Sequence, residues 1–182
     1  MKRSDGNVAA AALDLDVLIE EPAWLESVPD VEVLCRTAAE AAWSLGAPPH
    51  AHAASPADPV SACVLLASDD RVRALNRDFR GRDVPTDVLS FPAFEPDVLA
   101  AAGAEGPPPV LGDIVIALQT TLADAAQDGK TVKDHLRHLV VHGILHLLGY
   151  DHERDADAAE MEALEVNVLS SLGIKDPYGS EK

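Results

Sequence analysis

The stretch at 140–152, with the sequence VVHGILHLLGYDH, constrains this chain more than any other part of it. His142 and His146 are four residues apart, and at that spacing two helical side chains lie one above the other on the same face. Gly149 then lets the chain leave the helix and return His152 toward the pair. Three imidazoles can hold a zinc ion and leave its fourth coordination position open, which is typical of catalytic zinc. The sequence therefore predicts one Zn²⁺ per chain on His142, His146 and His152.

Two further histidines precede this pair on the same predicted helix. His135 lies about 10 Å along the helix axis from His142, at about 1.5 Å per residue, which is too far to share its metal. His138 lies one turn before His142 and could at most contact a metal-binding histidine without binding the metal itself. Packing or a surface hydrogen bond is the favoured interpretation of its role.

The ligand spacing equals that of the metalloproteases with the motif H-E-x-x-H-x-x-G-x-x-H. Those enzymes use the glutamate of the motif as their general base, whereas position 143 of this chain is glycine. The substitution argues against ordinary peptide hydrolysis. A zinc hydrolase of small molecules or peptides nevertheless stays open as an alternative function.

Three motifs occur in a fixed order along the chain: LNRDFRG at 75–81 leading into PTDVLSFP at 85–92, LGDI at 111–114, and HGILHLLGYDH at 142–152. Together they resemble the YbeY family of bacterial zinc-dependent endoribonucleases, over about residues 15–172. The resemblance implies a hydrolase that cuts single-stranded RNA in ribosome biogenesis, at the 3′ end of 16S rRNA, and in ribosome quality control. It also implies ribosomal RNA, the small ribosomal subunit and ribosome-assembly proteins as partners. A non-catalytic ribosome-assembly factor stabilised by zinc is the remaining alternative.

Arg80 ends the helix expected at 69–80, immediately before a glycine C-cap at Gly81. A guanidinium is always charged and pairs with phosphate through two parallel hydrogen bonds, so it can stabilise charge that grows on phosphoryl oxygens. By resemblance, the arginine at this position of the N-R-x-F-R-G segment is catalytic. The predicted catalytic residues are therefore Arg80 and His142. The alternative is that Arg80 only interacts with the carbonyl groups at its helix end.

The net charge of −17 is opposite to that expected of a nucleic-acid-binding protein. The distribution of charge is more informative, because several arginines lie close together and could form a basic rim for phosphate contacts on an acidic body. For Arg71 and Arg73, decoration of a solvated helix face is an open alternative. The arginines of this cluster are Arg71, Arg73, Arg77, Arg80 and Arg82.

The order of the expected elements predicts an α+β fold with a small mixed sheet surrounded by about five helices. The resemblance adds that the sheet has four strands, one of them an antiparallel edge strand, beside a metalloprotease-like zinc site. In the helix at 69–80, Val72, Leu75 and Phe79 follow helical spacing and should face the core. Strands are expected at 13–19, 60–67, 86–91 and 114–116, and the other helices at 30–45, 117–128, after Thr131, and at 155–172.

One domain is expected at 13–174, with a mobile loop at 95–110, a disordered tail at 1–12 and a C-terminal tail at 175–182. No apolar run approaches about 18 residues, so no membrane span is expected. Asp14 and Asp16 interrupt the apolar residues near the start, which argues against a signal peptide. Cys35 and Cys63 have no metal-binding spacing and are expected to be buried free thiols, so the predicted location is the cytoplasm.

Overall fold

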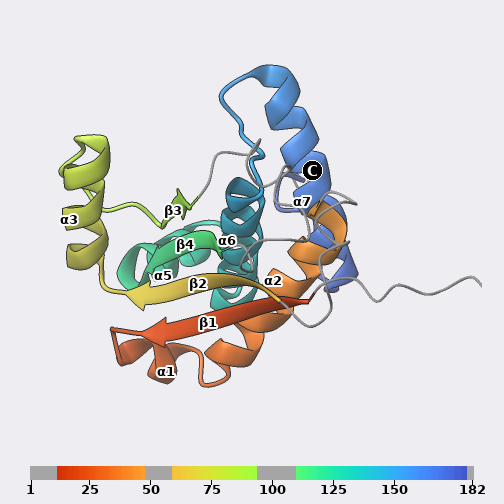
Figure 1. Cartoon of the computed structure of the whole chain (residues 1–182). Coiled ribbons are helices and arrows are strands. Elements are labelled where there is room, and N and C mark those ends of the chain that lie inside the picture. The colour runs from red at the N-terminus through yellow and green to blue at the C-terminus, as the bar shows by residue number, and fades with distance from the viewer. Residues whose placement is uncertain (1–11, 48–58, 94–109, 180–182) are drawn as a thin grey trace, which may run out of the picture.

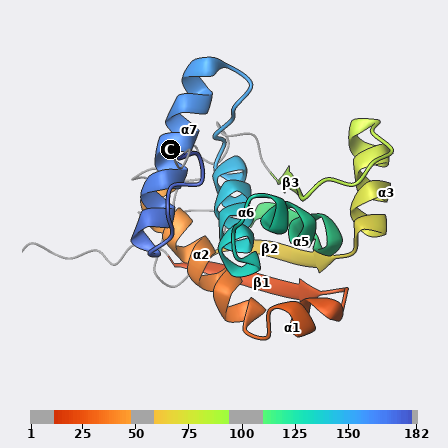
Figure 2. The same cartoon turned by 180° about the vertical axis from the view of Figure 1, so that it is seen from behind.

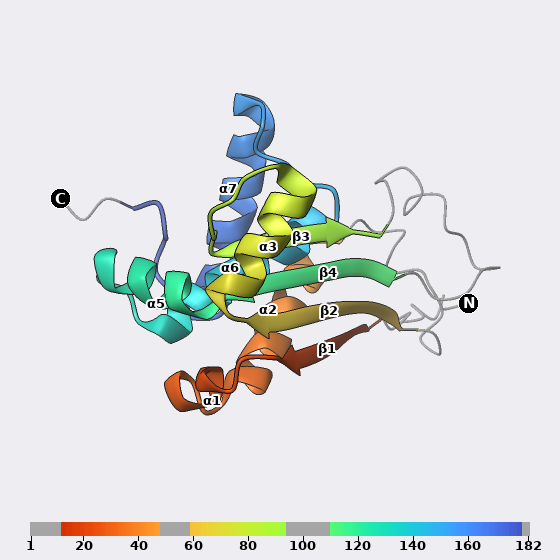
Figure 3. The same ribbon diagram turned by 90° about the vertical axis from the view of Figure 1, so that its left-hand side faces the viewer.

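A computed structural model describes residues 12–47, 59–93 and 110–179 of the chain. They form a mixed four-stranded sheet with the strand order β1-β2-β4-β3, which is visible in Figure 3. β1 is parallel to β2 and β2 to β4, whereas β3 pairs antiparallel with β4 at the edge of the sheet. The strands are β1 (Leu13–Ile19), β2 (Val60–Ala67), β3 (Val88–Pro92) and β4 (Val110–Ala117).

Six helices accompany the sheet within the described residues (Figure 1). The predicted α+β fold with a mixed four-stranded sheet is confirmed. The additional short helix, α1, was not expected, because its five residues are too few to show a helical period. The helices are α1 (Ala23–Ser27), α2 (Val31–Gly46), α3 (Asp69–Arg80), α5 (Leu118–Gln127), α6 (Val132–Leu147) and α7 (Asp155–Ser171).

β4 begins earlier than the sequence predicts. Val110 was expected to end the mobile loop at 95–110, but it is the first residue of β4 and aligns with Ser61 of β2. Three prolines precede Val110, and because proline is rare within strands, the sequence did not indicate that a strand begins there. The rest of that loop, and residues 1–11 of the expected N-terminal tail, lie outside the described residues.

α2 and α6 pack together against one face of the sheet (Figure 2). α6 begins at a capping threonine, because the Thr131 hydroxyl accepts the Asp134 backbone N–H at 3.0 Å. Leu136, Val140 and Ile144 then follow at helical spacing and are completely buried in the main core. This packing fixes the rotation of α6 about its axis. It therefore determines where the histidines on its other side point.

α3 lies against the opposite face of the sheet, over β3 and β4. It starts at Ser68, whose hydroxyl accepts the Arg71 N–H, and it is tied to α5 because both Asp69 oxygens accept hydrogen bonds from Thr120. Val72 is completely buried and Leu75 is partly buried, as expected. These contacts hold the first half of α3 on the sheet. In Figure 1 the rest of the helix stands apart from α6 and α7, with β3 between them.

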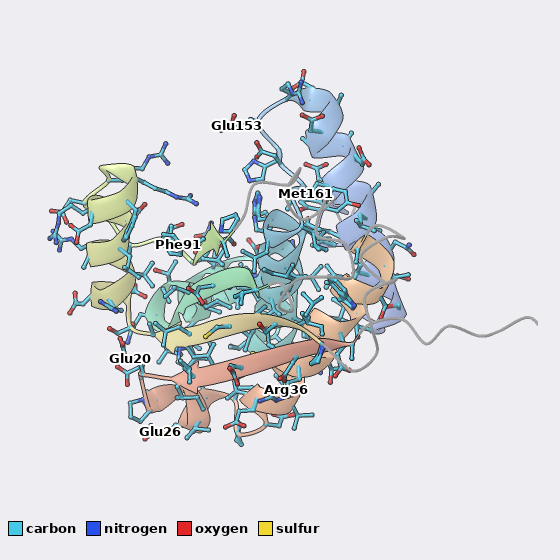
Figure 4. All side chains as sticks on the ribbon, in the orientation of Figure 1. Glu20, Glu26, Arg36, Phe91, Glu153 and Met161 are labelled. Carbon is cyan, nitrogen blue, oxygen red and sulfur yellow. The ribbon has the colours of Figure 1, made fainter. Side chains whose placement is uncertain are left out.

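The prediction that Phe79 faces the core is wrong. Its side chain is 69% exposed, and its ring meets Phe91 of β3 edge to face with centroids 5.2 Å apart. Figure 4 places Phe91 on β3, between α3 and α6. Phe79 has the correct helical spacing for burial, but it sits in the last turn of α3, beyond the residues that contact the small core cluster of Ala67, Val72, Leu89, Val115 and Ala117.

The two cysteines differ in their environment. Cys35 is completely buried in α2, and burial raises the pKa of its thiol to about 12. Cys63 of β2 is only partly buried, contrary to expectation, because β2 turns every second residue toward a less covered face. Both are free thiols. No helix among the described residues is long and apolar enough to cross a bilayer.

Candidate metal centre and the surrounding cavity

The structure brings His142, His146 and His152 together. His142 and His146 project from successive turns near the end of α6, and Gly149, with φ of +94°, turns the chain after the helix. His152 lies in the bend that leads into α7, next to Glu153, which Figure 4 labels. One ring nitrogen from each histidine lies within 4.8 Å of the other two. The three imidazoles thus form a cluster that could hold a metal ion.

The two helical histidines are already oriented for a shared ligand. His142 Nδ1 lies 2.6 Å from Glu165 Oε1, and His146 Nδ1 lies 3.0 Å from the Tyr150 carbonyl oxygen. Because a carboxylate and a carbonyl only accept, each Nδ1 carries the proton and each Nε2 keeps a lone pair. The two Nε2 atoms face one another at 3.0 Å. Two lone pairs at that distance repel, so the donor set fits a cation that both nitrogens bind.

Burial of the imidazole, and then the neighbouring His142, lower the pKa of His146 to about 4. The ring is therefore neutral at physiological pH. Neutral imidazole is the form that binds a metal ion through nitrogen. The neutral His146 imidazole is thus able to bind a metal ion at the place where the three histidines meet.

Glu165 of α7 is a residue of the site that the sequence reasoning missed. It is 1% exposed and contacts His142 through one oxygen, while the Tyr178 hydroxyl donates to the other. Burial would raise the pKa of Glu165, but the neighbouring His138, His142 and Tyr178 side chains outweigh it and hold the pKa at about 2. Glu165 is therefore a buried carboxylate that fixes the tautomer and rotation of His142.

A signal for Glu165 was present in the sequence. Met161, Leu164 and Val168 follow helical spacing in the sequence of the last helix, and position 165 is one turn from 161 and 168 on the same side. A charged residue at a core position is rarely tolerated without a partner, so it points to a buried polar interaction. The spacing could not identify its partners, because His142 lies on a different helix and Tyr178 belongs to the expected C-terminal tail.

Arg80 lies at the same cavity as the histidine cluster. A cavity of about 280 Å³ is lined by Arg80, Ser90 of β3 and the three histidines, and an adjoining one of about 560 Å³ is also lined by Arg82. The Arg80 side chain forms no hydrogen bond or ion pair with another described residue. The backbone N–H groups of Gly81 and Arg82 donate to the Arg77 and Asn76 carbonyls near the end of α3. The geometry therefore favours a free guanidinium over a helix cap.

The other arginines of the cluster are bound by carboxylates. Arg71 lies 3.5 Å from Glu20, and Arg77 lies 2.9 Å from Asp78. Arg73 forms two parallel hydrogen bonds with Asp83, at 2.8 and 2.9 Å. All three pairs are exposed. This agrees with the alternative that Arg71 and Arg73 lie on a solvated helix face. Arg80 and Arg82 remain as the members of the cluster without an ion pair among the described residues.

The glycine at 143 has a structural reason. Gly143 is buried where α6 approaches β4, and a Cβ atom added there would lie 2.7 Å from Ile114 Cδ1 and 2.9 Å from its Cγ2. A glutamate at this position would have to displace Ile114 from the core and would bury an unpaired charge. The close packing of helix and strand therefore excludes the general base of the metalloprotease motif.

Three further polar residues near the cluster have structural contacts. The Asp151 carboxylate accepts the His152 backbone N–H at 2.7 Å, so it stabilises the turn. His138 packs edge to face against Tyr178, and its Nε2 is 3.5 Å from Glu165 Oε2, long for a hydrogen bond. Asp87 holds the start of β3 by accepting the Val88 backbone N–H at 2.8 Å.

Comparisons with known proteins show the family to which the chain belongs. The family model described as Endoribonuclease YbeY matches residues 49–173. A protein of Paramagnetospirillum magneticum named Endoribonuclease YbeY is 47% identical, covering 93% of this chain and 98% of its own. One of the same name from Novosphingobium aromaticivorans is 44% identical, covering 96% and 99%. A solution structure from Thermotoga maritima is 26% identical with a TM-score of 0.46, covering 92% and 97%. The chain thus belongs to the endoribonuclease YbeY family.

Proposed function

We propose that this protein is a zinc-dependent endoribonuclease that cuts single-stranded RNA. Its proposed role is the maturation of the 16S rRNA 3′ end and ribosome quality control in the cytoplasm, with the small ribosomal subunit as partner. The names of the matched relatives support the class of enzyme. The observation that carries the proposal is that three imidazoles that could hold a metal ion line one cavity with an arginine that has no ion pair among the described residues.

His142, His146 and His152 are the proposed zinc ligands. A zinc ion held there would supply a Lewis acid for a phosphoryl oxygen. Glu165 and the Tyr150 carbonyl keep the two helical imidazoles in the tautomer that binds metal. Arg80 is proposed to bind the non-bridging oxygens of the scissile phosphate and to stabilise their charge in the transition state.

The exposed surface beside Arg80 suits a single strand better than a duplex. Phe79 presents an exposed aromatic ring one residue before Arg80, and the unpaired Arg82 lies two residues after it. Unstacked bases can stack on such a ring while arginines contact the backbone, whereas the bases of a duplex are already stacked. This combination supports RNA with unpaired bases as the substrate class.

The test of the proposed function is a cleavage assay with RNA that carries the 3′ end of 16S rRNA and its precursor extension. Zinc-loaded protein should cut the unpaired region, and chelation of the metal should abolish cleavage because the histidines alone offer no Lewis acid. Readdition of Zn²⁺ should restore it. Cleavage of a peptide library but not of RNA would contradict the proposal, and so would cleavage unaffected by chelation.

Arg82→Ala should lower the dependence of RNA affinity on salt. Each phosphate contact removed from a single strand should reduce the slope of log K against log salt by about 0.7. Arg73→Ala is the matched control, since it removes the same charge from α3 but from a guanidinium already paired with Asp83. Fluorescence anisotropy with a labelled oligonucleotide at several salt concentrations measures both slopes. Equal slopes in the two variants would exclude Arg82 as a phosphate contact.

A further inference from the structure

A second group of potential metal ligands lies outside the three-histidine cluster. It consists of Asp87 just before β3, Asp124 of α5 and His135 in the first turn of α6. One ligand atom from each of the three lies within 4.8 Å of the other two. These residues come from three different segments that the fold packs together, since α6 contacts both α5 and β3.

His135 provides an independent indication of a ligand. Its side chain is 6% exposed, and neither ring nitrogen has a hydrogen-bond partner among the described residues. A buried polar group without a partner destabilises the folded state, so native proteins rarely leave one. Both nitrogens of one imidazole are affected here. A bound ligand would therefore supply the partner that the His135 imidazole lacks.

Both carboxylates have oxygen atoms that accept no hydrogen bond from a described residue and could bind a metal ion. Asp87 uses Oδ1 to accept hydrogen bonds from Val88 N–H at 2.8 Å and from the Thr86 hydroxyl at 3.0 Å. Its Oδ2 accepts no hydrogen bond from a described residue. The Asp124 carboxylate, partly buried, is likewise without a hydrogen bond or ion pair among the residues that the structure describes. Neither carboxylate hydrogen-bonds to His135.

We propose that Asp87, Asp124 and His135 form a second divalent-cation site. Two carboxylates balance the charge of a divalent ion. Carboxylate oxygen together with imidazole nitrogen suits a first-row transition metal, such as Mn²⁺ or Zn²⁺. The three-histidine cluster differs, because it offers nitrogen ligands only.

The second site has a structural role and does not take part in bond cleavage. His135 is seven residues before His142, about 10 Å along the helix, whereas two-metal phosphodiester enzymes hold their ions about 3.5–4 Å apart. Asp87 and His135 nevertheless line the cavity that contains Arg80 and the three histidines. A cation there neutralises a carboxylate that would repel RNA, an effect that rests on the proposed function. It also ties α5, α6 and the start of β3 together.

Mn²⁺ binding is tested by electron paramagnetic resonance, in which free Mn²⁺ gives a sharp signal that is lost on binding. The full chain with His142→Ala and His146→Ala lacks the first site and should still bind about one Mn²⁺. Adding Asp124→Asn should weaken that binding by about 10- to 100-fold or more. The matched control is Asp128→Asn, which removes the same charge four residues later from a carboxylate paired with Lys130. It should leave Mn²⁺ affinity unchanged.

Absence of Mn²⁺ binding in the folded double variant, or equal affinity in the Asp124→Asn and Asp128→Asn variants, would overturn the proposal. Circular dichroism verifies that the double variant is folded. If it is not, elemental analysis of the otherwise wild-type chain after dialysis against excess Zn²⁺ decides the question, because Asp124→Asn alone should lose about one of two equivalents of metal. None of these measurements requires RNA cleavage, so they remain decisive if the proposed nuclease activity fails.

Discussion

Replacing Arg80 with alanine should lower the rate of RNA cleavage by about 10²–10³-fold, the effect of removing a single donor that stabilises developing charge. The guanidinium lines the histidine cavity, is exposed and has no partner among the described residues. Its removal should therefore leave the fold and the metal content unchanged. RNA binding should weaken far less than turnover, because the interaction strengthens as charge develops on the phosphoryl oxygens.

Single-turnover cleavage, RNA affinity and zinc content, measured on the same preparation, separate these effects. Arg80→Lys is the informative control, since it keeps the charge but loses the planar fork that binds two phosphate oxygens at once. It should recover only part of the rate. Near wild-type cleavage by Arg80→Ala would refute a role in the transition state, and loss of zinc would make Arg80 a structural residue.

Replacing His142 with alanine should reduce bound metal from about one equivalent to near zero in the three-histidine cluster and abolish cleavage. The same loss is expected for His146→Ala. The two variants should differ in stability, however. His142→Ala leaves one oxygen of the buried Glu165 carboxylate without its hydrogen bond, whereas His146→Ala leaves only the backbone carbonyl of Tyr150 without one.

In metal-free protein, His142→Ala should therefore be less stable than His146→Ala by about 1.5–3 kcal/mol, the typical contribution of a hydrogen bond to a charged group. Urea denaturation in the presence of a chelator measures this difference without any contribution from metal binding. Full metal content in either variant would refute the ligand assignment. Equal stability of the two metal-free variants would show that Glu165 does not depend on His142.

The sequence alone determined the parts of this protein that depend on local spacing. The histidines at positions 142 and 146 share a helix face, Thr131 starts their helix, and Gly149 ends it with a positive φ. The positions of the strands also followed to within about two residues, apart from the first residues of β4. Each of these features results from the chain within about one turn or one strand, so a periodic pattern is enough to reveal it.

Only the tertiary structure decided which polar groups are paired and which are free. It showed that Glu165 fixes His142, that three arginines are bound by carboxylates, and that Phe79 extends past the sheet into solvent. It also brought Asp87, Asp124 and His135 together. These relations join segments that are distant in the chain, and no periodic pattern records them. They depend on how α3, α5, α6 and α7 pack around the sheet, because packing determines which side chains meet and which remain exposed.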